Sequence, residues 1–234
     1  MKLSVIVPAY NEEKRIGATL IVYLEALERE FPGDYEVIAV CDGSVDRTVH
    51  IVRATAERYP ALSALWFPER MGKGGGVWAG FTEARGEIVG FVDSDGAFPV
   101  DDVLRLIRAV ENGADCAIAS KWKGRNFFQV PEPLLRKAAG RILSWILRLA
   151  FGFAIADTQA GCKFFKGNVL RRMPPLRCRG WEFDVELLWR IRQRHGVIRE
   201  FYVPTRHVEG SKFRMSNTLR MLWNLAKLRL GLFY

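Results

Sequence analysis

Residues 89–95 read Val-Gly-Phe-Val-Asp-Ser-Asp, an apolar run that leads directly into two carboxylates, Asp93 and Asp95. Side chains alternate along a strand, so residues spaced i and i+2 share one face. A strand that ends at Asp93 places the pair at its carboxyl end, where open α/β sheets bind ligands. Two close carboxylates repel each other unless a cation lies between them. The stretch therefore predicts a site for Mg²⁺ or Mn²⁺ that serves a phosphorylated substrate.

The pattern on both sides of this stretch predicts the fold. Asp-x-Asp alone also fits an ordinary turn, because Asp is a common turn residue, so the neighbouring elements matter. We expect strands at 3–8, 35–41, 62–67, 87–92, 114–120, 163–166 and 197–203, and helices at 12–30, 46–59, 73–85, 100–112, 131–153, 184–194 and 216–233. Because strands and helices alternate through the first half, the prediction is an α/β fold with a mainly parallel sheet flanked by helices.

Composition limits the possible classes of protein. The chain has 234 residues, 49% of them hydrophobic, and a net charge of +9, which suits nucleic acid, an anionic membrane or a phosphorylated substrate. The four cysteines are scattered, which favours a reduced environment, and the three histidines are unclustered, which argues against a zinc enzyme. We expect neither a signal peptide nor a transmembrane helix, since no uninterrupted apolar stretch reaches about 18 residues.

Three polar segments follow predicted strands. They are residues 8–12 (Pro-Ala-Tyr-Asn-Glu), 42–48 (Asp-Gly-Ser-Val-Asp-Arg-Thr) and 72–76 (Gly-Lys-Gly-Gly-Gly). Asn11 and Asp46 also fit simple helix caps, so capped turns are an alternative for the first two segments. The third lacks the spacing of a Walker A loop. We interpret it as a backbone loop near a diphosphate, with Lys73 as a charge partner, or else as a merely flexible loop.

Taken in order, these motifs resemble those of the family 2 glycosyltransferases of GT-A (Rossmann-like) fold. The strings are VIVPAYNEEKRI (5–16), CDGSVDRT (41–48), GKGGGVWAG (72–80) and FVDSDGAFP (91–99). Three later strings resemble the dolichyl-phosphate glucosyltransferase and dolichol-phosphate mannose synthase branch, and the glucosyltransferase type most of all. They are DTQAGCKFF (157–165), GWEFDVELLWRI (180–191) and HVEGSKFR (207–214).

The resemblance implies a set of binding residues. The base, ribose and diphosphate of a sugar nucleotide would be held by Pro8, Ala9, Tyr10, Glu12, Asp42, Lys73, Asp93, Ser94 and Asp95, with Asp93 and Asp95 also binding the metal. The acceptor and its phosphate would be held by Lys121, Arg136, Gln159, Arg206, Ser211 and Lys212. Ala97 stands where mannosyltransferase relatives often place a third metal ligand, so water would complete the metal's coordination.

The resemblance also implies a reaction, namely metal-dependent displacement with inversion at the anomeric carbon. The donor is GDP-mannose or UDP-glucose, and the acceptor is a polyprenyl or dolichyl phosphate, whose anionic oxygen needs no general base. An alternative acceptor is a hydroxyl of a lipid-linked saccharide in N-glycan assembly. That reaction needs a carboxylate to take the proton, with Asp184 as first choice and Glu182 as second. Asp184 and Glu186 could instead belong to a solvated helix surface.

Two segments combine apolar and basic residues in a helical pattern, which is typical of helices at a bilayer surface. The stripe in 131–153 comprises Leu135, Ala138, Ala139, Ile142, Trp145, Ile146 and Leu149. The stripe in 216–234 comprises Leu219, Leu222, Trp223, Ala226 and Leu230. Core or dimer contacts are the alternative for both.

We therefore expect a glycosyltransferase domain at 1–215 and a membrane-interface helix at 216–234, which in relatives often leads to transmembrane helices. The protein would be membrane-associated, its active site would face the cytoplasm, and it would bind no nucleic acid. The competing classes are a noncatalytic membrane-surface scaffold and a nucleic-acid-binding protein. The first has no use for a repelling carboxylate pair, and the second lacks the usual basic and stacking motifs.

Overall fold

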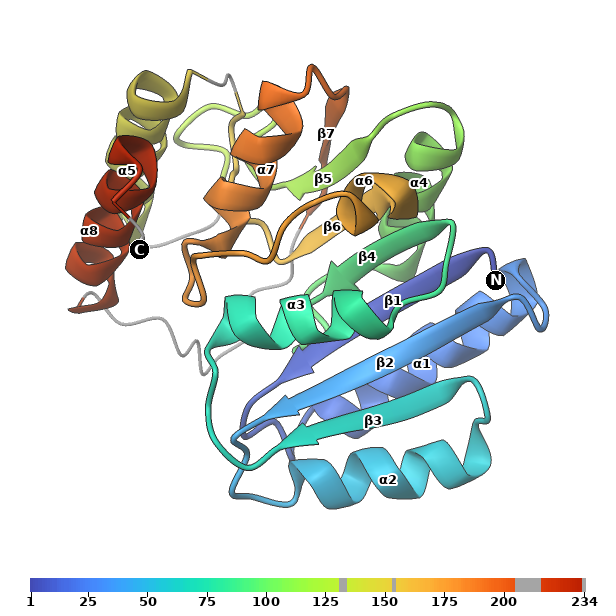
Figure 1. The fold of residues 1–234 in the computed structure, drawn as a ribbon. Coiled ribbons are helices and arrows are strands. Elements are labelled where there is room, and N and C mark those ends of the chain that lie inside the picture. Colours follow the sequence, from blue (N-terminus) through green and yellow to red (C-terminus); the bar gives the residue numbers. More distant parts are fainter. Residues whose placement is uncertain (131–133, 153–154, 205–215, 233–234) are drawn as a thin grey trace.

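Seven strands form one sheet in the order β3-β2-β1-β4-β6-β5-β7 within the described residues of this computed structural model (Figure 1). The structure describes residues 1–130, 134–152, 155–204 and 216–232. The strands are β1 (Leu3–Ala9), β2 (Tyr35–Asp42), β3 (Leu62–Phe67), β4 (Ile88–Val92), β5 (Cys116–Ser120), β6 (Cys162–Lys166) and β7 (Ile198–Tyr202). Each corresponds to a strand that the sequence predicted.

The sheet is mainly parallel, as the sequence predicted, and β6 is the strand that runs against the others. Strand β6 lies between β4 and β5, with Cys162 beside Val92 and Lys163 beside Phe91. Because β6 is antiparallel, its first residues lie at the edge where β4 ends. The chain that enters β6 is thereby placed next to Asp93.

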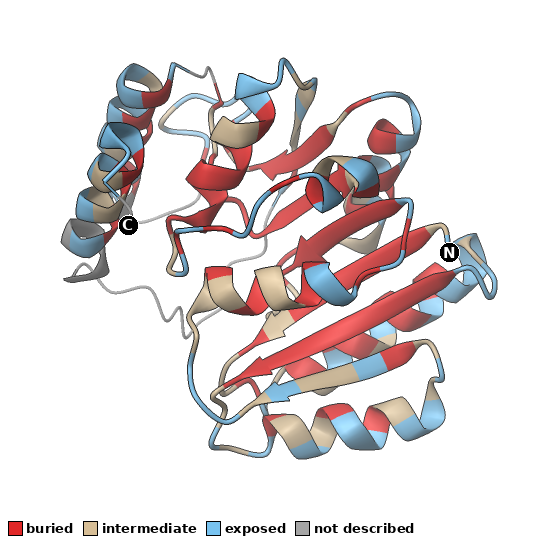
Figure 2. Cartoon of the chain, viewed as in Figure 1, coloured by how far each residue is buried: buried red, intermediate tan, exposed pale blue. Residues whose placement is uncertain are grey.

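Helices cover both faces of the sheet (Figure 1). They are α1 (Ile16–Glu30), α2 (Thr48–Arg58), α3 (Lys73–Glu83), α4 (Val100–Glu111), α5 (Leu134–Phe151), α6 (Gly167–Arg171), α7 (Phe183–Gln193) and α8 (Ser216–Leu230). One apolar core joins α1, α2 and α4 to the sheet, and a second joins α3, α5, α6, α7 and α8 to its other face. Figure 2 shows the inner strands buried between these layers, whereas the edge strands β3 and β7 and the outer helix faces are partly exposed.

Three local predictions need correction. Helix α1 begins at Ile16 rather than at residue 12, because Asn11 adopts a φ of 53° and a turn follows in which Arg15 and Ile16 donate to the Glu12 carbonyl. Residues 73–76 form the first turn of α3, which agrees with the helix predicted at 73–85 and corrects the loop interpretation of 72–76. The short helix α6 was not predicted, since five residues are too few to show helical periodicity.

The four cysteines are free and buried. Burial raises the pKa of the Cys41 thiol to about 11, so this side chain stays a neutral, packed group. None of the helices in the described ranges combines the length and the apolar character needed to cross a bilayer.

Candidate active site

The acidic pair lies directly beyond β4, at the carboxyl edge of the sheet. Asp93 follows the last residue of the strand, and the Asp95 carboxylate accepts a hydrogen bond of 3.0 Å from the Ala97 amide. Burial and the nearby Asp93 charge together raise the pKa of Asp95. The Asp93 charge therefore disfavours the charged form of Asp95, which is the electrostatic condition that a bound cation relieves.

Lys73 supplies a positive charge to this pair from the first turn of α3. Its Nζ atom lies 2.7 Å from an Asp93 carboxylate oxygen and 5.0 Å from the centre of the Trp181 ring. Burial acts to lower the pKa of Lys73, but the carboxylates of Asp93, Asp184 and Asp95 outweigh it and raise this pKa. The sequence predicted Lys73 as a charge partner for a diphosphate, and in the structure its ammonium pairs with Asp93 of the predicted metal site.

A second ion pair, between Lys163 and Asp184, lies inside the core. Asp184 stands in the first turn of α7 and is 1% exposed, and its carboxylate lies 2.6 Å from Nζ of Lys163, which is fully buried on β6. The Lys163 ammonium also donates to the Ala160 carbonyl at 2.6 Å. Burial raises the pKa of Asp184, while the positive charges of Lys163 and Lys73 oppose this rise.

The idea that Asp184 and Glu186 form a solvated helix surface is wrong. Both side chains are buried, because the first turn of α7 packs into the core that α3 shares with the sheet. The Glu186 carboxylate accepts the amides of Arg177 and Cys178 and pairs with Arg190, so it fixes the loop before α7. Glu182 is also buried, and it accepts a hydrogen bond of 2.8 Å from Asn224 on α8.

The residues present fit a divalent metal. Three carboxylates, those of Asp93, Asp95 and Asp184, act on the Lys73 ammonium, and Asp184 is already paired with Lys163. Among the residues that the structure describes, no group of three or more His, Cys, Asp or Glu side chains is placed to hold a metal. A site of two carboxylates completed by substrate phosphates and water is typical of Mg²⁺, and Mn²⁺ accepts the same oxygens.

A glycine makes room for the first carboxylate. A Cβ atom at Gly161 would lie 2.0 Å from an Asp93 carboxylate oxygen, and the Gly161 carbonyl accepts the Asp93 amide at 2.8 Å. Sequence reasoning assigned no role to Gly161 or to Lys163. For Lys163 a signal was available, because a lysine between Cys162 and Phe164 in a buried strand must find a partner for its charge.

Asp42 ends β2 at the same edge, where the sequence placed it for contacts to a base or ribose. Its buried carboxylate accepts the amides of Met71 and Gly72 at 2.7 and 2.9 Å, so it holds the segment that leads into α3. The glycines of this segment allow close packing. A Cβ atom at Gly72, whose φ is 93°, would lie 2.5 Å from the Arg179 carbonyl oxygen, and one at Gly74 would lie 2.5 Å from Cβ of Phe183.

The other predicted donor residues lie on neighbouring segments of this edge. Pro8 and Ala9 end β1, and the Arg70 guanidinium carbon stacks 3.8 Å above the centre of the Tyr10 ring. The Glu12 carboxylate pairs with Arg15 at 2.5 Å. Ser94, between the two aspartates, is buried.

The predicted acceptor residues are described in part. The Lys121 amide donates to Asp157 at 3.3 Å, and the Gln159 side-chain amide donates to the sulfur of Met221 on α8 at 3.0 Å. Helix α8 therefore contacts both Gln159 and Glu182, which the sequence placed on the acceptor side. The Arg136 side chain and residues Arg206, Ser211 and Lys212 lie outside the described residues.

Comparison with known proteins identifies relatives along almost the whole chain. The family model of glycosyl transferase family 2 matches residues 4–166. A dolichyl-phosphate beta-glucosyltransferase of Trichomonas vaginalis is 34% identical, over 99% of this chain and 73% of the relative. Enzymes of the same name from Saccharomyces cerevisiae and Homo sapiens are 30% and 32% identical, over 98% and 90% of this chain and 74% and 69% of theirs.

Solved structures with the same fold include glucosyl-3-phosphoglycerate synthase from Mycobacterium tuberculosis. Its complex with Mn²⁺ and UDP-glucose superposes with a TM-score of 0.73 at 21% identity and covers 98% of this chain and 79% of that one. Its complex with Mg²⁺ and UDP gives a TM-score of 0.69. At this identity the likeness establishes a shared fold, which confirms the predicted GT-A architecture.

Proposed function

This chain belongs to glycosyl transferase family 2 and is therefore a glycosyltransferase, and we propose that it moves glucose from UDP-glucose to a dolichyl or related polyprenyl phosphate. The observation that carries the proposal is the match, at 30–34% identity, to dolichyl-phosphate beta-glucosyltransferases over nearly the whole chain. The structural relative crystallised with UDP-glucose supports the choice of donor over GDP-mannose.

The geometry supports a displacement in which the acceptor is already anionic. Asp93 and Asp95 would hold Mg²⁺ or Mn²⁺, which when bound neutralises the departing diphosphate. Lys73, charged and beside Asp93, adds a further positive charge next to the same phosphates. Attack by the lipid phosphate oxygen in line with the departing diphosphate inverts the anomeric carbon.

The state of Asp184 favours a phosphate acceptor over a hydroxyl acceptor. A hydroxyl nucleophile needs a carboxylate that is free to take its proton. Asp184 is 1% exposed and paired with Lys163 at 2.6 Å, and Glu182 is buried and bonded to Asn224. Transfer to a hydroxyl of a lipid-linked saccharide remains the alternative, with Asp184 as its base.

The first test is a transfer assay in detergent with UDP-glucose and GDP-mannose as donors. The acceptors are a polyprenyl phosphate and a polyprenyl-diphosphate-linked saccharide, each with Mn²⁺ or with EDTA. We expect glucosyl-phosphoryl lipid from UDP-glucose with Mn²⁺ and none in EDTA. Product from GDP-mannose but not from UDP-glucose would contradict the proposed donor. Product on the saccharide but not on the polyprenyl phosphate would contradict the proposed acceptor, and full activity in EDTA would contradict the proposed metal dependence.

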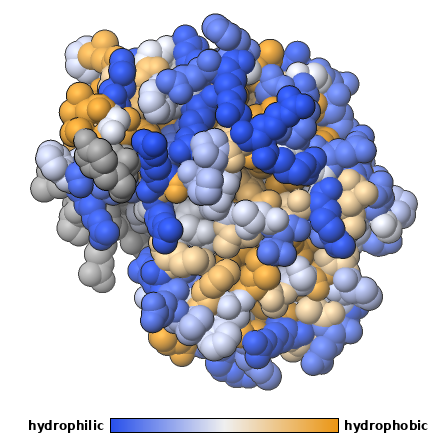
Figure 3. Space-filling view, viewed as in Figure 1, coloured by the Kyte–Doolittle hydropathy of each residue, from blue (hydrophilic) through white to orange (hydrophobic). Residues whose placement is uncertain are grey.

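We also propose that α5 and α8 lie on the membrane surface. Helix α5 exposes Ile142, Trp145 and Leu149 by 61–67%, and α8 exposes Trp223 and Leu230 by 62% and 70%. Figure 3 shows hydrophobic residues gathered at the edge formed by α5, beside strongly hydrophilic side chains. Because these side chains are exposed, the alternative that they belong to the core is wrong; the alternative of a dimer contact is left to experiment. The cytoplasmic orientation stays a prediction.

Substitution of the two exposed tryptophans tests this placement. We expect Trp145→Ala/Trp223→Ala to reduce the partition of the protein onto vesicles at least about tenfold, because each indole contributes about 1.5 kcal/mol or more when it leaves water. Trp66→Ala is the matched control, since Trp66 is 49% exposed on β3 at the opposite edge of the sheet. Equal losses in cosedimentation for both variants, or a concentration-dependent dimer that the double variant abolishes, would contradict the proposal.

A further inference from the structure

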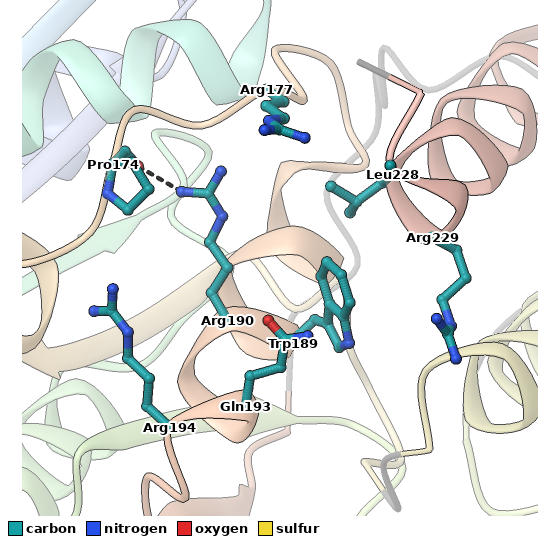
Figure 4. Close-up of a pocket in the computed structure, with 9 residues that line it drawn as sticks. Pro174, Arg177, Trp189, Arg190, Gln193, Arg194, Leu228 and Arg229 are labelled. Atoms are coloured by element: carbon teal, nitrogen blue, oxygen red, sulfur yellow. Dashed lines mark hydrogen bonds between the residues drawn. The ribbon is translucent and has the colours of Figure 1, made fainter. Parts of the chain in front are cut away.

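A pocket of about 340 Å³ lies between α7, the loop before it and the end of α8 (Figure 4). Four arginines line it, Arg177, Arg190, Arg194 and Arg229, together with the side chains of Trp189 and Leu228. Helix α7 rises about 1.5 Å per residue, so Gln193 in this pocket lies about 14 Å along the axis from Asp184. The far end of the pocket is therefore distant from Asp184. Its near end, at Arg177, lies two residues before Arg179, whose carbonyl accepts the Gly75 amide in the first turn of α3.

The charge of the pocket is strongly positive. Glu186 is the carboxylate that contacts these arginines, and it pairs with Arg190 at 2.5 Å. Arg190 also donates to the Pro175 carbonyl at 3.2 Å, Arg194 to the Arg172 carbonyl at 3.2 Å, and Arg229 to the Ala150 carbonyl at 3.0 Å. Carbonyl groups orient a guanidinium without neutralising it, and among the described residues no carboxylate pairs with Arg177, Arg194 or Arg229.

Arg177 is the clearest of these charges. Its backbone amide is bonded to Glu186, but within the described part of the chain its guanidinium forms neither a hydrogen bond nor an ion pair. Figure 4 shows this guanidinium above the pocket, with Arg190 and Trp189 below it. Guanidinium groups bind phosphate through paired N–H donors, which makes a phosphate group the best complement to this arrangement.

The wall of the pocket indicates where that phosphate comes from. Trp189 and Leu228 form an apolar side, and the chain beside it exposes Leu230 and Leu232 by 70% and 46%. Helix α8 also carries exposed Trp223, and Arg229 ties it to α5 through Ala150. The positive pocket is thus continuous with the apolar surface that we assign to the membrane, and an amphiphile with a phosphate headgroup matches both parts.

We propose that this pocket, lined by Arg177, Arg190, Arg194 and Arg229, binds the phosphate headgroup of an anionic membrane phospholipid. Such a contact orients the domain on the bilayer from a point outside the donor site. The proposal rests on the membrane placement of α5 and α8 and is independent of which sugar is transferred.

The test is cosedimentation of the full chain, without substrates, with vesicles of phosphatidylcholine alone or mixed with phosphatidylglycerol. The variant Arg177→Gln/Arg194→Gln removes two exposed charges and leaves the Arg190–Glu186 pair in place. A basic residue at an anionic surface contributes about 1 kcal/mol, so we expect binding to mixed vesicles to fall about 30-fold. The matched control is Arg29→Gln/Arg58→Gln, which removes the same charge from exposed positions on α1 and α2.

We expect the control to bind nearly as the unmodified chain does, because charges farther from the bilayer than the Debye length of about 8–10 Å are screened. Equal binding by both double variants, or no preference for phosphatidylglycerol vesicles, would overturn the proposal. Thermal stabilisation by glycerol phosphate that is lost in Arg177→Gln/Arg194→Gln, without any vesicle difference, would overturn it in favour of a soluble phosphate ligand.

Transfer in detergent separates this inference from the proposed function. Arg177→Gln/Arg194→Gln should retain the unmodified rate with UDP-glucose and a polyprenyl phosphate, because among the described residues neither side chain pairs with Asp93, Asp95 or Asp184. A rate that falls in detergent as vesicle binding falls would place these arginines in the acceptor site instead, which also overturns the proposal. Absence of transfer in the unmodified chain counts against the proposed function alone, since vesicle binding is measured without substrate.

Discussion

Asp93→Asn is expected to abolish sugar transfer while the protein stays folded. The substitution removes one of two carboxylates that fit the metal and one of the acidic partners of Lys73. Stabilisation of a departing diphosphate by a bound cation contributes several kcal/mol, so we expect kcat/KM to fall at least about 10³-fold. Asp95→Asn should act similarly, because Asp95 shares the site and its charge is already opposed by burial and by Asp93.

The measurement is kcat/KM for transfer with Mn²⁺, together with the thermal shift that UDP-glucose produces with Mn²⁺ and with EDTA. In Asp93→Asn the shift should no longer depend on Mn²⁺, while the melting temperature without ligand stays close to that of the unmodified chain. Asp101→Asn is the control, an exposed aspartate in the first turn of α4 near the same loop. A variant at Asp93 that keeps a tenth of the activity would contradict the assignment of the metal site.

Lys163→Met is expected to lower the free energy of unfolding by about 3–5 kcal/mol. It leaves the Asp184 carboxylate, which is 1% exposed, without the ammonium that lies 2.6 Å away in the core. Lys166→Met is a matched control on the same strand, because Lys166 pairs with Asp115 at 2.8 Å near the surface, where the side chains are 35% and 23% exposed. Such a pair contributes about 0–1 kcal/mol.

Urea denaturation measures both effects. The double variant Lys163→Met/Asp184→Leu should recover most of the stability, since replacing both partners of a buried pair by apolar residues is often neutral. A Lys163→Met variant as stable as Lys166→Met would show that the buried pair has no structural role. A double variant that is stable but inactive would show that Asp184 serves the reaction as well as the fold.

Local patterns in the sequence were enough to predict much of the framework. Seven strands, the helices that alternate with them and the place of Asp93 and Asp95 beyond β4 follow from periodicity and turn residues over short stretches. The motif order also indicated the family, which the comparisons confirm. Even the exposure of Trp145 and Trp223 agrees with the stripes read from the sequence.

The tertiary structure alone decided how these parts meet. Nothing in residues 162–166 says that β6 enters antiparallel between β4 and β5, and this insertion brings Lys163 beside Phe91 and Gly161 against Asp93. The sequence allowed Asp184 to lie on an exposed helix surface. It is buried because α7 packs against β6, where its partner Lys163 stands 21 residues earlier in the chain. Periodicity is a local property, whereas strand pairing and the desolvation of a charge depend on contacts between distant segments. The sequence by itself therefore determined the strands, the helices and the acidic edge of the sheet. Only the tertiary structure determined the ion pairs Lys73–Asp93 and Lys163–Asp184.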